Sequence, residues 1–305
     1  MSGTHLPGLE ATNPLGFFAA LGIQVAFAQA PSCPRLWWTD GVVPHAMVDV
    51  ESSVEAIAEQ VIEVLPIWQE SPAIAHGLEP VHDVKFQPCE MRRYLQKARA
   101  AGLLGTLAGA LVAEGSVDNS GKAKPSPLYF TSGNQLFLKV IDDLIAKVTY
   151  EDIVAGLAGP WPYTSTLPTL MWDVVDDRNY ALLASDPSPQ TKKNRKRTNP
   201  GPECLALLGM SRYPVFGSRG RTLTQGTSGG WKKGAFSWPV WTAPATRAAV
   251  ASILAHASGT KEQLRSRTQW LGAWGVQKVL QAPIRRTDQG GYGSFGPHDV
   301  IWEHE

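Results

Sequence analysis

A run of apolar residues near the start of the chain gives the clearest structural signal. From residue 15 to residue 29 almost every position is apolar or small. Asn13 can cap a helix here, and Pro14 suits its first turn because the proline ring already fixes a helical φ. A helix that is apolar on all sides is buried in the protein interior. The pattern therefore predicts a central helix at residues 15–29, after a short strand at residues 4–11.

The rest of the first half shows mostly the three-and-four-residue spacing of amphipathic helices. Helices are predicted at residues 52–68, 90–114, 134–147 and 150–157. Two apolar segments on either side of an Asp40-Gly41 turn predict an antiparallel hairpin, with strands at residues 35–39 and 46–50. A further short strand is predicted at residues 83–86.

Beyond Gly159 the pattern changes to short strands separated by long turns. Strands are predicted at residues 172–175, 180–183, 213–216, 223–225, 235–241 and 299–302, and helices at residues 202–208 and 244–257. This indicates an α+β fold, with a helix-rich N-terminal half and a strand-rich C-terminal half built on short antiparallel sheets. A soft boundary near Gly159 divides residues 1–159 from residues 160–305, within one domain or between two.

Composition narrows the class of protein. The chain has 305 residues, of which 43 % are hydrophobic, so it can bury a sizeable core. No apolar run reaches the roughly 18 residues that cross a bilayer, and no basic flank opens a signal peptide, so a cytoplasmic protein without a membrane partner is expected. Three widely spaced cysteines, Cys33, Cys89 and Cys204, indicate neither a disulfide framework nor a zinc module.

Charge is distributed very unevenly. The whole chain carries a net charge of only +1, yet the segment from Thr191 to Lys233 is nine charges positive and the other 262 residues sum to −8. Such asymmetry predicts a polyanionic partner. The ten basic residues of this segment are Lys192, Lys193, Arg195, Lys196, Arg197, Arg212, Arg219, Arg221, Lys232 and Lys233. Its many glycines, hydroxyl side chains and aromatic rings suit a sugar-phosphate backbone and its bases.

The basic segment itself divides into two parts. Residues 192–197 lie between turn signals, and a solvated mobile loop is as good an interpretation of them as a binding arm that orders on contact. The later basic residues, from Arg212 onward, lie on or beside predicted strands and are the more dependable contacts. Arg285 and Arg286 precede a Gly-x-Gly-x-x-Gly pattern at residues 291–296, which can clamp phosphate or form a plain turn. Pro297 follows that pattern, which excludes a dinucleotide-binding fold.

Two motifs fit hydrolases by their letters alone. Residues 226–230 read Gly-Thr-Ser-Gly-Gly, but a nucleophile elbow needs a helix next, and Trp231-Lys232-Lys233 follows instead. A mobile hairpin tip is the better interpretation. His82-Asp83 and His298-Asp299 resemble the core of metal-dependent phosphohydrolases, which requires helices where residues 83–86 predict a strand.

An acidic cluster offers one further catalytic hypothesis. Asp173, Asp176 and Asp177 lie around Arg178, and paired carboxylates can hold magnesium for phosphoryl chemistry. Neutralisation by Arg178 is the stronger explanation. A metal-dependent nuclease therefore stays an alternative, and no metal or other cofactor is expected.

Three segments of the chain together resemble a known protein family. They are Leu-Pro-Gly-Leu at residues 6–9 with Asn-Pro-Leu-Gly-Phe-Phe-Ala-Ala-Leu-Gly at residues 13–22; Trp-Asp-Val-Val-Asp-Asp-Arg-Asn-Tyr-Ala-Leu at residues 172–182; and Asp-Pro at residues 186–187 with Asn-Pro-Gly-Pro-Glu at residues 199–203. In this order they resemble a family encoded in type I-G (formerly I-U) CRISPR loci. That family accompanies or extends the CRISPR helicase-nuclease and is similar to parts of the large subunit of Cascade-like effector complexes.

The resemblance implies an antiviral role in an RNA-guided complex and brings no catalytic residue set with it. In such complexes guide pairing reads the sequence, while the proteins grip backbones. The leading hypothesis is a non-enzymatic effector component that binds crRNA or target DNA through residues 192–233. Other effector subunits or the helicase-nuclease are its expected protein partners. A third hypothesis is a protein adaptor that docks the helicase-nuclease and touches nucleic acid only incidentally.

Overall fold

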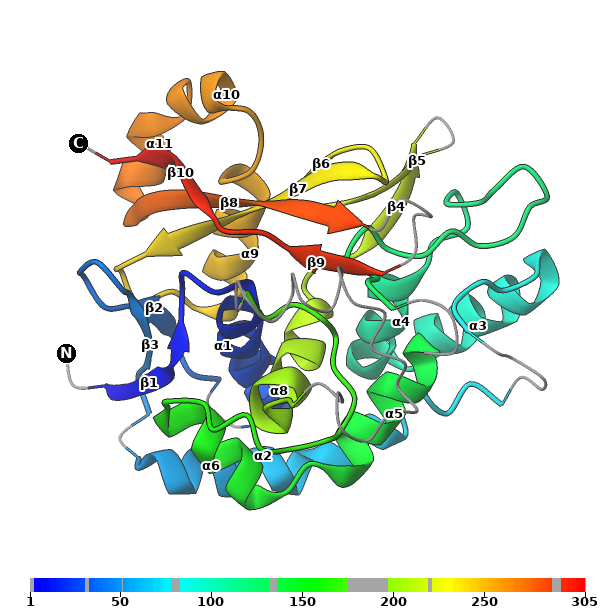
Figure 1. Cartoon of the computed structure of the whole chain (residues 1–305), viewed down its shortest axis with the longest axis horizontal. Helices are drawn as coiled ribbons and strands as arrows, with labels where there is room; N and C mark the ends of the chain where they lie inside the picture. Colours follow the sequence, from blue (N-terminus) through cyan, green and yellow to red (C-terminus); the bar gives the residue numbers. More distant parts are fainter. Residues whose placement is uncertain are drawn as a thin grey trace.

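The computed structural model describes residues 3–30, 33–50, 52–77, 83–131, 136–174, 197–218, 221–286 and 292–304. It confirms the predicted α+β class: helices lie mostly in the N-terminal half and strands mostly in the C-terminal half, and the sheets are small and antiparallel. Figure 1 shows helices along the lower part of the molecule and the largest sheet across its upper part.

Two buried helices form the centre of the molecule: α1 (Pro14–Ala26) and α8 (Pro200–Met210). Every residue of both helices is buried, as the apolar pattern predicts for α1. The Asn13 side chain accepts a hydrogen bond from the Leu15 amide and caps α1. The two backbones come unusually close, because a Cβ atom on Gly22 would overlap the carbonyl oxygen of Leu205. Glycine is therefore required at this crossing.

The remaining elements of the first half surround this pair. A three-stranded antiparallel sheet with the order β1-β3-β2 contains β1 (Thr4–Glu10), β2 (Leu36–Trp38) and β3 (His45–Val48). The helices are α2 (Val54–Gln69), α3 (Pro88–Ala100), α4 (Thr106–Leu111), α5 (Phe137–Lys147) and α6 (Tyr150–Ala158), with short 3₁₀ turns at Phe27–Gln29 and Gly102–Gly105.

Several predicted elements differ from the observed ones. The long helix predicted at residues 90–114 is divided into α3 and α4, because Gly102 takes a positive φ of 56° and a 3₁₀ turn follows it. Residues 83–86 and 172–174 form no regular strand. The strand predicted at residues 180–183 lies outside the described residues.

The second half builds a five-stranded antiparallel sheet and a two-stranded ribbon. The sheet has the order β10-β8-β7-β6, and β9 also pairs with β8. Its strands are β6 (Thr227–Gly229), β7 (Lys233–Trp241), β8 (Val276–Arg286), β9 (Gly293–Phe295) and β10 (Asp299–Glu303). The ribbon pairs β4 (Val215–Ser218) with β5 (Arg221–Thr224), and α9 (Arg247–His256), α10 (Lys261–Arg265) and α11 (Thr268–Ala273) connect β7 to β8.

Strand β8 is the longest strand and the sequence pattern does not predict it. Pro283 argues against a strand because proline cannot donate to a ladder. In the structure β10 pairs with residues 278–281 of β8 and β9 pairs with residues 284–286, so Pro283 lies where one partner gives way to the other.

One connected hydrophobic core includes buried residues from both sides of Gly159. Trp238 donates its indole N–H to the carbonyl oxygen of Ala11 at 2.7 Å, and Trp241 donates to that of Leu36 at 2.7 Å. These bonds tie β7 to the N-terminal strands. The two-part division stays a prediction. Across the described ranges, every helix is too short or too polar to traverse a lipid bilayer.

Candidate nucleic-acid interface

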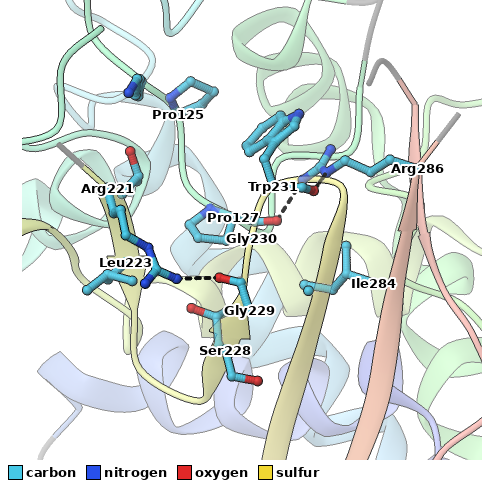
Figure 2. A pocket seen from close by; sticks show the side chains of 14 residues that line it. Pro125, Pro127, Arg221, Leu223, Ser228, Gly229, Gly230, Trp231, Ile284 and Arg286 are labelled. Carbon is cyan, nitrogen blue, oxygen red and sulfur yellow. Dashed lines mark hydrogen bonds between the residues drawn. The ribbon is translucent and has the colours of Figure 1, made fainter. Parts of the chain in front are cut away.

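Five basic residues of the C-terminal half line hollows beside the hairpin formed by β6 and β7: Arg221, Lys232, Lys233, Arg285 and Arg286. Two adjoining hollows, each with a volume of about 430 Å³, share Ser228, Gly229 and Gly234 of this hairpin. The first hollow lies between the hairpin, β5, the end of β8 and the loop at residues 124–127 (Figure 2). Segments about 160 residues apart along the chain therefore meet here.

Glycine residues make the hairpin possible. Gly226, between β5 and β6, has a φ of 75°, and Gly229 has a φ of 76°. The Gly230 amide donates to the Lys233 carbonyl oxygen at 3.1 Å and closes the tip. A strand follows this tip where a nucleophile elbow needs a helix. The motif thus belongs to a hairpin, but its residues 227–229 form β6 and the tip lies just beyond them, at residues 230–232.

The first hollow is lined by both apolar and basic residues. Its larger apolar lining residues are Pro125, Pro127, Leu223, Trp231 and Ile284, and its basic lining residues are Lys124, Arg221 and Arg286. Trp231 is 42 % exposed at the hairpin tip. Arg221 donates a hydrogen bond to the Gly229 carbonyl oxygen at 2.6 Å, which links β5 to the hairpin (Figure 2).

Arg286 connects the hairpin tip to the loop opposite. Its Nε atom donates to the Trp231 carbonyl oxygen at 3.0 Å, Nη1 donates to that of Tyr129 at 2.9 Å, and Nη2 donates to that of Pro127 at 2.8 Å. The guanidinium carbon also lies 3.7 Å from the centre of the Trp231 ring. Burial lowers the pKa of Arg286 to about 10, so the group remains charged at neutral pH. Arg286 thus positions Trp231.

The second hollow continues the basic surface along the sheet. Lys233 on β7 pairs with Arg285 on β8, and Lys232 precedes them at the tip. Lys232 and Lys233 are exposed and Arg285 is half-buried. Among the described residues that line the two hollows, six are basic and none is acidic. We name the lining of the two hollows the basic interface. Its cations are Lys124, Arg221, Lys232, Lys233, Arg285 and Arg286.

Two predicted contact residues lie elsewhere. Arg212 donates to the Arg247 carbonyl oxygen at 2.6 Å, beside the start of α9, and burial together with the Arg247 charge lowers its pKa. Arg197 is exposed and donates to the Thr164 carbonyl oxygen at 3.0 Å. Neither residue lines the hollows. The predicted contacts Lys192, Lys193, Arg195, Lys196 and Arg219 lie outside the described residues.

Lys124 is the cation that sequence reasoning missed. It joins the interface because the loop before it crosses the β4–β5 ribbon, where a Cβ atom on Gly217 would overlap the Gly115 carbonyl oxygen. The Ser116 and Thr222 hydroxyls hydrogen-bond across the same crossing. Lys122 and Lys124 form only a short pair of lysines in a loop, a pattern too common to have indicated this position.

The predicted metal candidates are used structurally where they are described. Asp173 is buried, and its carboxylate accepts hydrogen bonds from Asn13 Nδ2 and from the Tyr163 hydroxyl, both at 2.8 Å. Asp173 therefore steadies the residue that caps α1. Asp176 and Asp177 lie outside the described residues. Within the described ranges, no three His, Cys, Asp or Glu side chains gather in a way that could hold a metal ion.

The described residues of the two His-Asp dipeptides also make structural contacts. The Asp83 carboxylate accepts from the Tyr129 hydroxyl at 2.5 Å and from the Phe137 amide at 3.0 Å, so it joins the loop before α5 to the start of that helix. His82 lies outside the described residues. His298 packs edge-on against the Trp238 ring, with 6.3 Å between the ring centres.

Comparison with known proteins adds no relative to this description. The chain matches no protein-family model, and a search of curated proteins finds no significant match. The geometry of the basic interface is therefore the main indication of function.

Proposed function

We propose that the chain is a non-enzymatic, nucleic-acid-binding component of an RNA-guided antiviral CRISPR effector complex. In this proposal the basic interface grips the backbone of crRNA or target DNA. The observation that carries the proposal is the pair of hollows with six basic and no acidic residues among their described lining. The resemblance of three sequence segments to a type I-G CRISPR family supports the assignment to such a complex.

The shape of the hairpin suits a phosphate backbone. Gly229, Gly230 and Gly234 present no side chains, and a Cβ atom on Gly230 would meet nothing within 4 Å. A sugar-phosphate chain can therefore approach closely enough for the neighbouring cations to contact its phosphates. Lysine and arginine contacts with phosphate release counterions and carry no sequence information, which is the role expected of a protein beside a guide RNA.

Charge neutralisation at the basic interface tests the proposal. The variant R221Q/K232Q/K233Q/R285Q keeps Arg286, so the hairpin stays anchored. The matched control R92Q/R93Q/K261Q/R265Q removes four exposed positive charges from α3 and α10. Fluorescence anisotropy with labelled RNA and DNA should show affinity at least about a hundredfold weaker for the first variant, and near that of the wild type for the control. Equal affinities of the two variants would contradict the proposal.

The two rival functions give different results. Cleavage of labelled RNA or DNA with Mg²⁺ or Mn²⁺ that is lost in Asp176→Ala would identify a nuclease instead. For the adaptor hypothesis, nucleic-acid contact is only incidental, and capture of the helicase-nuclease would survive nuclease treatment.

A further inference from the structure

We infer that the first hollow receives one unpaired base of the bound strand, so that the basic interface selects single-stranded over double-stranded nucleic acid. This inference rests on the proposed function and adds to it the form of the nucleic acid that is bound. Charge is enough for a surface that only grips a phosphate backbone, whereas the first hollow also has apolar walls.

The chemistry of the hollow matches that of a nucleotide. A base has flat, largely apolar faces and hangs from a charged backbone. The hollow places Pro127, Leu223 and Ile284 on its walls beside the cations Lys124 and Arg221. Its volume of about 430 Å³ lies within the range of roughly 300–1,000 Å³ that is usual for pockets that bind small molecules.

Trp231 is held ready to stack on a base. Arg286 covers the indole at 3.7 Å and also bonds the Trp231 carbonyl oxygen, while two further carbonyls fix the guanidinium itself. The ring is therefore ordered before any strand arrives, and 42 % of Trp231 remains exposed. Binding a base to a pre-ordered ring costs less entropy than ordering a free side chain. Stacking on an aromatic ring typically strengthens single-strand binding about tenfold or more per base.

The duplex form of the same nucleic acid cannot use this hollow without disruption. Bases in a duplex are paired and stacked, and a base must leave the stack before its face can meet a side chain. Little preference among the bases is expected, because two of the three hydroxyls that line the hollow are engaged within the protein: Thr222 bonds to Ser116 and Thr227 bonds to Thr224. Stacking, which every base allows, remains the main interaction.

The occupant is a strand rather than a single nucleotide. Lys232, Lys233 and Arg285 line the second hollow, beyond the first one. A mononucleotide in the first hollow would leave these cations without phosphate, whereas the backbone on either side of the inserted base can follow them.

The test uses the full chain, the variants Trp231→Ala and Trp231→Phe, and three labelled DNA probes of one length: a single strand, a duplex, and a single strand without bases. The abasic strand keeps the phosphate charge and removes only the stacking partner. Wild-type protein should bind the normal single strand at least about tenfold more tightly than the other two probes. Trp231→Ala should bind the normal and abasic strands equally, and Trp231→Phe should restore most of the difference.

The outcomes separate this inference from the proposed function. The charge variant is R221Q/K232Q/K233Q/R285Q. If it loses binding but Trp231→Ala keeps full preference for the normal strand, the first hollow does not bind a base and only the backbone interface is supported. Wild-type affinity for the abasic strand or the duplex equal to that for the normal strand would also overturn the inference. If the charge variant binds every probe like the wild type, the proposed function itself fails.

Discussion

The guanidinium group of Arg286 is shared among three backbone carbonyls and one face of Trp231. The Gly-rich pattern at residues 291–296 made Arg286, which precedes it, a candidate phosphate contact. The structure gives it the further task of joining the hairpin tip to the loop at residues 127–130. The other cations of the basic interface remain as the candidate contacts with the backbone: Lys124, Arg221, Lys232, Lys233 and Arg285.

A conservative substitution at Arg286 tests this anchoring role. Lysine keeps the charge but cannot reach three carbonyls with a planar fork, so Arg286→Lys should lower the free energy of unfolding by about 2–4 kcal/mol. The control Arg221→Lys alters one exposed hydrogen bond and should change it by less than about 0.5 kcal/mol. Urea denaturation measures both values. Similar small effects in the two variants would show that Arg286 is not an anchor.

For single residues, sequence reasoning identified those that are clustered along the chain and missed those that folding brings together. Lys232 and Lys233 are adjacent in a basic segment, so the sequence alone predicts them as phosphate contacts. Lys124 reaches the same interface only through the crossing of Gly115 and Gly217, which local sequence does not encode. Asp173 shows the same limit, because the sequence favours a structural role for it but does not indicate that its partners are Asn13 and Tyr163.

At the scale of elements, the central pair α1 and α8 depends on close approach of two backbones. Gly22→Ala places a methyl group against the Leu205 carbonyl oxygen and should destabilise the fold by about 3 kcal/mol or more.

Gly109 in α4 supplies the matched control for Gly22. A Cβ atom there meets nothing within 4 Å, so Gly109→Ala should stabilise the protein by about 0.5–1 kcal/mol through helix propensity. Thermal unfolding compares the two variants. A harmless Gly22→Ala would show that the helices are not packed this closely.

Element prediction succeeded where local rules and tertiary packing agree. Asn13 and Pro14 fix the start of α1 whatever surrounds it. The prediction failed at residues 90–114, where Gly102 lets the chain turn inside a helical pattern, and at β8, where two separate partner strands make Pro283 acceptable. Those outcomes depend on neighbours that are distant in sequence.

At the scale of the whole molecule, two histidines link stability to pH. Burial lowers the pKa of His298, and burial together with the nearby His45 lowers the pKa of His5, both below the ordinary value of 6.5. The unfolded chain therefore binds protons first as the pH falls. Their contribution is fully present above pH 6.5 and is lost as the pH drops through the folded-state values.

Urea denaturation at pH 7.5 and at pH 5.5 checks this linkage. The wild type should lose stability between these two pH values, and the double variant H5Q/H298Q should lose less. An equal loss in both proteins would show that these histidines do not cause the pH dependence.

The overall charge distribution also matters at the scale of the whole molecule. A chain with a net charge of +1 cannot attract polyanions by its total charge, so the proposed binding depends on where the positive groups gather. The basic interface gathers six of them around one hairpin, and the structure shows how β5, β7, β8 and a loop of the helix-rich half contribute to it.

The salt dependence of nucleic-acid binding tests whether the basic interface contacts the phosphate backbone. Each phosphate contact contributes about 0.7–0.9 to the slope of log affinity against log salt concentration. Replacing Arg221, Lys232, Lys233 and Arg285 with glutamine should therefore reduce the magnitude of the slope by about 3. The control variant on α3 and α10 should keep the wild-type slope. A wild-type slope in R221Q/K232Q/K233Q/R285Q, or an equal reduction in the control, would show that the basic interface is not where the chain contacts phosphate.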